Sequence, residues 1–280
     1  MKLPVITLKQ REILKLLYRY RFLNRIQIQA MMHHKDYRRI NAWLSDLREK
    51  GYIGRIYSTD FTEKTKPAIC YLALNGIREL GKQTTKRDDG QEHHAYPVLE
   101  LRKRYRESSR SAGFVARSVL IAECCMVLEA KTNQETRYVY MVPVDYASDD
   151  HNFHFLAESE TANPHLCFIK EQGAKGSGTI ANYLLEVLDE TLPRYRLKFR
   201  IKQYIAFLSD DEWESGDNDP PPIILLVCAN KTDLIYAKRR AKALLDNDWD
   251  TDDEDRPHIR FATTAQVKQE GVTARIWEQA

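Results

Sequence analysis

The stretch from Asp36 to Gly51, DYRRINAWLSDLREKG, most constrains the fold of this 280-residue chain. Asp36 is a favoured N-cap residue, and Gly51 is the residue type that most often closes a helix in the left-handed conformation. Between them, Ile40, Leu44 and Leu47 recur at the spacing of one helical face. The stretch therefore predicts a short amphipathic helix whose apolar side packs onto a core.

The other face of this predicted helix carries arginines and small polar side chains, whereas a merely solvated face more often mixes Glu with Lys. Guanidinium, amide and hydroxyl groups can bond to phosphates or to base edges in a DNA groove. We interpret the stretch as a recognition helix. Three of its side chains are expected to meet base edges: Arg38, Asn41 and Ser45. The alternative interpretation is that the arginines only keep a packing helix soluble.

The segments before this helix predict two more helices. Residues 8–21 place apolar side chains on one helical stripe with basic residues around it. Asn24 is a favoured cap for the next helix, and Gln27 stands at the position that completes a capping box. Three short helices, of which the third is basic on its outer face, are typical of a helix-turn-helix core.

Two predicted strands and a polar loop follow. Residues 52–57 and 68–74 are rich in strand-forming side chains, and the loop between them has the polarity and length of a wing. Residues 75–80 predict a further helix, so residues 1–81 are expected to form a winged helix-turn-helix domain. Five basic side chains of this domain are expected to hold phosphates: Arg39, Arg48, Arg55, Lys64 and Lys66.

The charge of the chain is distributed unevenly. Residues 1–110 hold 24 Lys and Arg against 12 Asp and Glu, whereas the remainder holds 19 against 28. Since phosphate contacts come mainly from Lys and Arg, an anionic polymer is expected to meet the first half only.

Residues 82–110 predict a linker that is followed by a basic segment. The polar stretch up to residue 97 is rich in turn-forming residues. Two interpretations stay open for residues 101–110: an extension of the DNA contact along the backbone, or the solvated start of a helix. Four histidines lack the matched Cys or carboxylate spacing of a metal site: His33, His34, His93 and His94.

The second half, residues 111–280, predicts an α/β domain with a mixed sheet, which makes the whole chain α+β. Helices are predicted over residues 112–130, 193–208 and 232–245, with a closing helical segment that ends at Trp277. Strands are predicted over residues 137–142, 152–156, 165–169, 183–188, 223–229 and 258–262. The continuous apolar run at 223–229 is typical of a strand buried on both faces. Acidic residues 209–219 and 246–255 predict solvated loops.

Carboxylates and basic residues meet late in this domain. Glu186 stands near the end of a predicted strand, Asp189 follows it, and the next helix carries Lys198 and Lys202. Carboxylates at strand ends with a nearby Lys can hold a divalent metal ion and a water beside a phosphodiester, as metal-dependent nucleases do. The alternative is that both carboxylates have structural roles at a strand end and a helix cap.

The chain resembles the replication-relaxation proteins of plasmids and other mobile elements. The resemblance lies in KGYIGRIY and YLALNGIREL, in YLLEVLDETLPRYRLKFRIKQY and in the terminal TTAQVKQEGVTARIW. It implies a winged helix followed by a domain like the restriction-endonuclease fold, and some relatives look like relaxases that nick DNA. On that resemblance Glu186 and Asp189 would bind Mg²⁺ or Mn²⁺, and Lys198 or Lys202 would stabilise charge. The chain departs from the nuclease pattern at His165 and Leu188, where Asp and Lys would be expected.

These observations predict a sequence-specific double-stranded DNA-binding protein of a mobile element, acting in replication, mobilisation or transcriptional control. A single winged helix offers a small interface, so a homodimer or larger assembly is expected. The alternatives are a metal-dependent nicking endonuclease and a scaffold subunit of a defence or transfer complex. Binding alone needs no cofactor. Five cysteines without CxxC spacing, no leader and no long apolar run predict a reduced cytoplasmic protein without a membrane partner.

Overall fold

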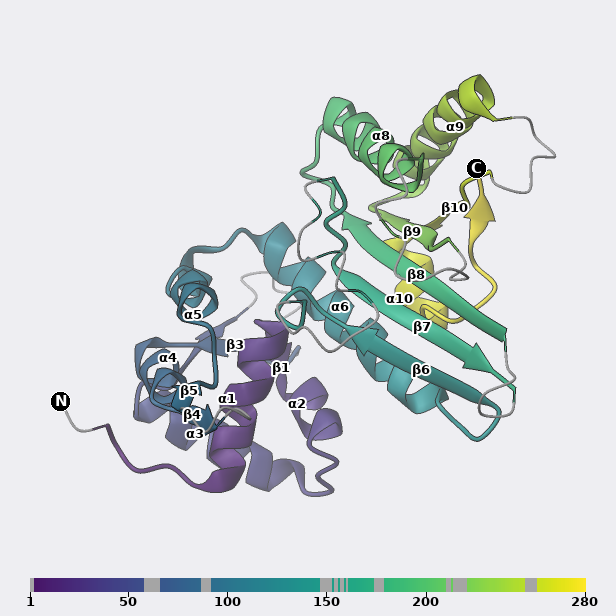
Figure 1. Cartoon of the computed structure of the whole chain (residues 1–280). Helices are drawn as coiled ribbons and strands as arrows, with labels where there is room; N and C mark the ends of the chain where they lie inside the picture. The colour runs from purple at the N-terminus through teal and green to yellow at the C-terminus, as the bar shows by residue number, and fades with distance from the viewer. Residues whose placement is uncertain are drawn as a thin grey trace. The chain divides into compact units, whose positions relative to one another are not determined.

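The computed structural model describes residues 3–57, 66–86, 92–146, 153, 156, 159, 161–173, 179–209, 213, 221–249 and 256–280 (Figure 1). The chain is a mixture of helices with antiparallel and mixed sheets, which confirms the predicted class at that level. It divides into two compact units, Met1–Ala122 and Glu123–Ala280.

The first unit begins with helices and small antiparallel strands. Its helices are α1 (Leu8–Tyr20), α2 (Arg25–Met31), α3 (Tyr37–Glu49), α4 (Leu74–Gly81), α5 (Val98–Arg104) and the 3-10 helix η2 (Glu107–Ser109). Its strands are β1 (Leu23–Asn24), β2 (Ile53–Ile56), β3 (Ile69–Leu72), β4 (Thr84–Lys86) and β5 (Glu92–His94). Strands β1, β3 and β2 form one antiparallel sheet in that order, and β4 pairs with β5.

The helix ends in this unit follow the capping residues of the sequence. Thr7 and Asn24 each cap a helix through a capping box with the residue three positions on. The Asp36 side chain accepts a hydrogen bond from the backbone of Arg38 at 2.8 Å and starts α3. Gly51 has a φ of 71°, as expected for the residue that follows a helix end and turns the chain into β2. The three predicted helices therefore lie where their local signals place them.

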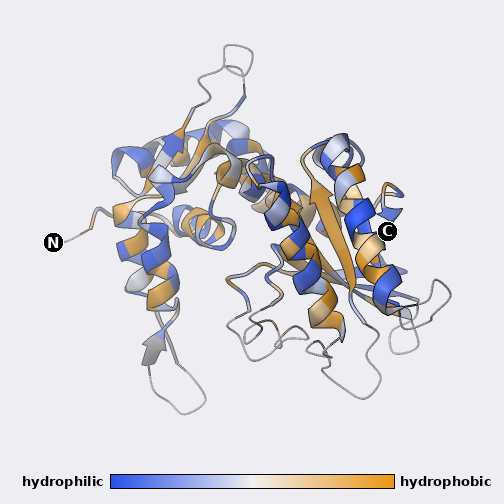
Figure 2. Ribbon diagram, turned by 90° about the horizontal axis from the view of Figure 1, so that it is seen from above, coloured by the Kyte–Doolittle hydropathy of each residue, from blue (hydrophilic) through white to orange (hydrophobic). Residues whose placement is uncertain are grey.

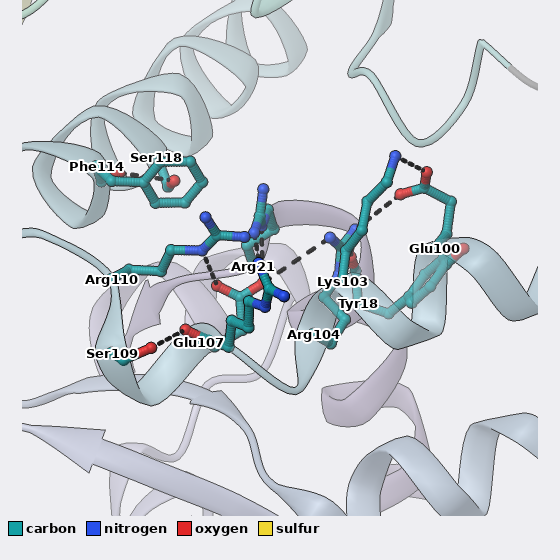
Figure 3. Close-up of polar contacts among 11 residues, drawn as sticks. Tyr18, Arg21, Glu100, Lys103, Arg104, Glu107, Ser109, Arg110, Phe114 and Ser118 are labelled. Atoms are coloured by element: carbon teal, nitrogen blue, oxygen red, sulfur yellow. Dashed lines mark hydrogen bonds and ion pairs between the residues drawn. The ribbon is translucent and has the colours of Figure 1, made fainter.

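The segment predicted as a linker contains helices whose charged side chains turn inward. Glu107 is fully buried among three arginines (Figure 3). Arg21 bonds to the Glu107 carboxylate at 2.7–2.8 Å, while Arg104 and Arg110 lie 3.8 and 3.9 Å from it. Arg104 also donates to the backbone carbonyl of Tyr18 in α1 at 3.1 Å. These contacts fasten α5 and η2 to the first helix.

The first compact unit extends beyond residues 1–81, the predicted winged helix-turn-helix domain. Residues 98–110 belong to the first unit, and the division falls within helix α6 (Ala112–Lys131). The physical reason is the buried carboxylate, which draws basic side chains of this segment away from solvent.

The second unit is built on a six-stranded mixed sheet. Its order is β11-β10-β9-β8-β7-β6. The strands are β6 (Thr136–Met141), β7 (Leu166–Gln172), β8 (Thr179–Leu188), β9 (Ile223–Cys228), β10 (Ile259–Thr263) and β11 (Glu278–Gln279). Strands β6, β7 and β8 form an antiparallel meander, β8, β9 and β10 are parallel, and β11 is antiparallel to β10. The mixed sheet and its fully buried β9 agree with the prediction.

Three further helices follow strands of this sheet: α8 (Arg194–Ser209), α9 (Lys231–Asp248) and α10 (Thr264–Glu270). Helices α8 and α9 lie side by side over one face (Figure 1), where Ile201, Leu234 and Ala237 pack against strand residues such as Leu184 and Leu226. Figure 2 shows the same pattern in hydropathy, since the sheet is mainly apolar while the helices have apolar and polar faces. Because side chains alternate along a strand, the neighbouring strand residues point to the opposite face.

Two predicted elements of the second half are absent or shorter. Of residues 152–156, predicted as a strand, the structure describes Phe153 and Leu156, and neither lies in a strand. The closing helix ends at Glu270, not at Trp277, because Gly271 has a φ of 89°, which lies outside the helical region. Most of the predicted wing, residues 59–66, and most of both acidic stretches lie outside the described residues.

The five cysteines are buried and free, as predicted. Burial raises the pKa of the Cys70 thiol to about 11 and that of Cys124 and Cys228 to about 12. Since the thiolate is the reactive form, we expect iodoacetamide at pH 8 to leave the folded protein unlabelled and to label all five thiols in denaturant. Mass spectrometry of the intact chain measures this. Rapid labelling of a native thiol would show that the core around it opens.

Candidate nucleic-acid interface and carboxylate site

Helix α3 separates an apolar side from a polar side. Ile40, Leu44 and Leu47 are at most 2% exposed and pack into the first unit. The predicted base-contacting and phosphate-contacting residues of this helix are all exposed: Arg38, Arg39, Asn41, Ser45 and Arg48. The helix thus presents three guanidinium groups, an amide and a hydroxyl to solvent.

Contacts at the C-terminal end of α3 fix it against α1. The Gln10 side-chain amide donates to Asp46 at 2.5 Å, and Lys50 donates to the same carboxylate oxygen at 2.8 Å. These hydrogen bonds hold the pKa of Asp46 below its usual value, and the one from Lys50 has the larger effect. Lys50 also bonds to the backbone carbonyl of Val5 at 2.9 Å. The recognition face is therefore carried by a helix whose orientation is set by packing and by polar contacts.

Two exposed tyrosines lie beside the arginines of this face. The Tyr37 ring is 50% exposed, and the Arg25 and Arg38 guanidinium groups lie 5.5 and 5.9 Å from its centroid. Arg48 donates to the hydroxyl of Tyr57, which is 55% exposed, at 3.2 Å. Sequence reasoning missed both tyrosines. A tyrosine close to an arginine in the sequence could have suggested them. Its exposure, however, cannot be predicted from residue spacing at the start of a helix or the end of a strand.

The remaining predicted phosphate contacts lie on β2 and near β3. Arg55 is half-buried in β2. Burial raises the pKa of Cys70, whereas the charge of Arg55 and its hydrogen bond to the thiol lower it. Lys66 is exposed just before β3. Lys64 lies outside the described residues. The predicted α3 residues are therefore exposed on one helix, Arg55 lies on the sheet, and Lys66 lies just before β3.

The carboxylate site of the second unit is organised around an ion pair. Glu186 in β8 is 6% exposed, and both of its oxygens accept hydrogen bonds from Arg200 of α8, at 2.9 and 2.8 Å. Burial lowers the pKa of Arg200, but the hydrogen bonds and charge of Glu186 outweigh it and raise that pKa. Arg200 also donates to the Asn163 carbonyl at 3.3 Å. A divalent ion would reach Glu186 only after Arg200 had moved away.

Residues next to this ion pair have structural contacts. The His165 ring accepts a hydrogen bond from the backbone N–H of Val187 at 3.0 Å, so the histidine that replaces the expected Asp links β8 to the start of β7. Burial, and then the charge of Glu186, raise the pKa of Tyr204 well above its usual value. The Tyr204 phenol thus lies near Glu186, while the His165 ring nitrogen is occupied by the backbone of β8.

The other predicted catalytic residues have separate positions. Asp189 accepts hydrogen bonds from the backbone N–H and the hydroxyl of Thr191, at 3.0 and 2.5 Å, in the turn before α8. Lys198 is half-buried and Lys202 is exposed on α8. Within the described part of the chain, no three His, Cys, Asp or Glu side chains are grouped to hold a metal ion. Sequence reasoning missed Arg200 as the partner of Glu186, because the two lie on different elements.

Comparisons with known proteins give no relative for this chain: no family model, curated protein or solved structure matches it. Among the described helices, none has the length and apolar character needed to cross a membrane.

Proposed function

We propose that the protein binds double-stranded DNA and that residues 3–81 form a winged helix-turn-helix domain. Three features support the proposal: the order of helices and strands, the antiparallel sheet β1-β3-β2 and the position of α3 directly before β2. In such domains the second helix of the helix-turn-helix enters the major groove. The corresponding element here is α3.

The observation that carries the proposal is the polar side of α3. Its arginines are exposed, whereas Asp36 caps the helix and Asp46 binds Gln10 and Lys50. The remaining acidic residue, Glu49, is exposed at the C-terminal end of the helix. Arg38, Asn41 and Ser45 would read base edges, and the basic residues around them would hold phosphates. Tyr37 and Tyr57 would support the neighbouring guanidinium groups by stacking.

The second unit would serve assembly or partner binding. Its meander, crossover helix and parallel strand are compatible with the nuclease-like fold that the resemblance to replication-relaxation proteins implies. On the same resemblance, the bound DNA would belong to a plasmid or another mobile element. The Glu186–Arg200 ion pair favours binding over metal-dependent nicking, since the carboxylate has a protein cation as its partner.

Selection of bound duplex fragments from random and plasmid DNA, run with and without Mg²⁺, tests the proposal. We expect one enriched sequence motif that is the same in both conditions. Selected pools without a motif, together with affinity that does not change with salt, would contradict it. New strand ends at the motif in Mg²⁺ would instead support the nicking endonuclease.

Salt dependence tests the phosphate contacts separately. We expect Arg39→Ala combined with Arg48→Ala to weaken binding to all duplexes alike. The slope of log affinity against log salt should fall by about 2, because each lost phosphate contact removes about 0.9 from it. Fluorescence anisotropy at several salt concentrations measures the slope.

The matched control is Arg239→Ala with Lys242→Ala, two exposed basic residues on α9 of the second unit. This control removes the same charge and should leave the slope unchanged. An equal loss of slope in both double variants would assign the effect to net charge and would exclude a specific phosphate contact at α3.

A further inference from the structure

The second unit has a cleft on the face of the sheet opposite α8 and α9. Its volume is about 320 Å³, within the range of small-ligand sites. The sheet supplies one wall, and the segment between α10 and β11 supplies the other. The lining residues that bear on its chemistry are Tyr138, Phe168, Lys170, Tyr183, Arg275 and Trp277.

Aromatic rings form the floor of this cleft. Phe168 and Tyr183 stand directly opposite each other on β7 and β8, with ring centroids 4.6 Å apart and planes inclined by 11°. The Tyr138 ring on β6 lies 6.3 Å from that of Phe168. Phe168 is 3% exposed and supports the two tyrosines, which are partly exposed. We call Tyr138, Phe168 and Tyr183 the aromatic platform.

Cations flank the aromatic platform. Lys170 on β7 pairs in register with Tyr138, and Arg260 lies on β10, three strands away, so about 14 Å separates the two strands. Arg275 is exposed on the opposite wall. No Asp or Glu is among the described residues that line the cleft. The cleft therefore combines flat apolar rings with positive charge at both ends.

The indole of Trp277 completes the wall opposite the sheet. Its N–H donates to the backbone carbonyl of Val272 at 3.0 Å, which fixes the ring relative to the segment after α10. Val272 itself is buried. The hydrogen bond to the Val272 backbone and the burial of the Val272 side chain thus hold this wall in place.

We propose that this cleft binds an unpaired stretch of nucleic acid. Bases would stack on the aromatic platform, and phosphates would meet Lys170, Arg260 and Arg275. Sheet aromatics flanked by basic side chains are the usual means of binding single strands, since every base has a flat face. An acidic peptide would use the cations but not the stacked rings. The inference concerns the second unit and does not depend on duplex binding by α3.

Binding of a fluorescein-labelled oligothymidylate to the full chain, followed by anisotropy, tests the proposal. We expect Tyr183→Ala to weaken binding about 10-fold or more and Tyr183→Phe to retain it. Lys170→Ala combined with Arg275→Ala should weaken binding by a similar factor. Trp277 fluorescence should be quenched by the oligonucleotide, and Trp277→Phe should remove that signal.

Two control variants make the outcome specific. Tyr195→Ala with Arg196→Ala removes an exposed ring and an exposed cation from α8, on the other side of the sheet, and should leave binding unchanged. Arg38→Ala with Asn41→Ala should also leave it unchanged, which separates this site from α3. Circular dichroism of each variant checks that the fold is retained.

Three results would overturn the proposal. The first is binding that Tyr183→Ala and the Lys170/Arg275 double variant leave intact. The second is loss of oligonucleotide binding in the α3 variant alone, which would assign single strands to the duplex site. The third is polyglutamate binding that the cleft variants abolish while oligonucleotide binding persists, which would assign the cleft to an acidic protein partner.

Discussion

Arg38→Ala combined with Asn41→Ala is expected to abolish site-specific duplex binding while the protein stays folded. Arginine and asparagine make the bidentate contacts that identify guanine and adenine, and each such contact contributes about 1–3 kcal/mol of discrimination. Loss of both would cost roughly 2–6 kcal/mol, or about 30-fold or more in affinity for the selected site. Anisotropy with the selected duplex and with a scrambled one measures the difference.

The scrambled duplex distinguishes base reading from charge loss. Binding to it should fall little, because contacts to phosphate from the other basic residues remain. Both side chains are exposed, so the unfolding midpoint should change little, as is usual for surface substitutions away from caps and ion pairs. Equal weakening on both duplexes would show that α3 contributes only charge. An unchanged preference would place sequence recognition outside α3.

The bounds of α3 show what local sequence can predict. Cap, apolar stripe and closing glycine all lie within 16 residues of one another, and the observed helix Tyr37–Glu49 with its Asp36 cap follows them closely. The same holds for the buried strand Ile223–Cys228. Its continuous apolar run is typical of a central strand that is covered on both faces of a sheet. Features set within one helical turn or one strand can be predicted from the sequence, because the groups that interact are close together along the chain.

Pairings between distant residues were not predictable in this way. Glu186 and Arg200 belong to a strand and to the helix that follows it, and nothing in their spacing shows that both carboxylate oxygens point at that guanidinium. The metal-site prediction considered Lys198 and Lys202 on the same helix, which point elsewhere. A carboxylate near the end of a strand is compatible with metal binding and with an ion pair, and only the tertiary structure identifies its partner.

The basic segment before α6 illustrates the same limit. Its composition suggested a solvated or phosphate-binding surface, yet Arg104 is 3% exposed. The decisive residue is Glu107, which is 86 positions from Arg21 in the sequence. Long-range ion pairs of this kind leave no periodic pattern. The segment was therefore predicted as a DNA contact or a solvated helix start, although its Arg104 side chain is buried in the first unit.

Glu107→Ala is expected to destabilise the first unit by about 3–5 kcal/mol, the usual cost of leaving buried charges without their partner. Glu107 is fully buried, and three arginines depend on it. Burial already lowers the pKa of Arg21 and of Arg104, which shows how costly their charges are there. Urea unfolding followed by circular dichroism measures the loss.

The matched control is Glu100→Ala, which removes a carboxylate from the same segment. Glu100 is partly exposed, pairs with Lys103 at 2.5 Å and lies 3.9 Å from Arg104. Because Arg104 keeps the closer Glu107 carboxylate, the loss of Glu100 should cost at most about 1 kcal/mol, as for other partly exposed ion pairs. A larger loss for Glu107→Ala than for Glu100→Ala would confirm that burial, not charge count, sets the effect.

The same variant tests whether Glu107 fastens α5 and η2 to α1. Arg21 has a φ of 69°, an unfavourable conformation for a residue other than glycine, and the ion pair with Glu107 helps to hold it there. Without the carboxylate, the repelling arginines should release residues 98–110, and amide hydrogen exchange in α5 should speed up before that in α3. Uniform exchange across the first unit would instead mean that Glu107 stabilises the unit as a whole. Unchanged exchange, with stability equal to that of Glu100→Ala, would show that the arginines find other partners and that the buried carboxylate does not hold the segment in place.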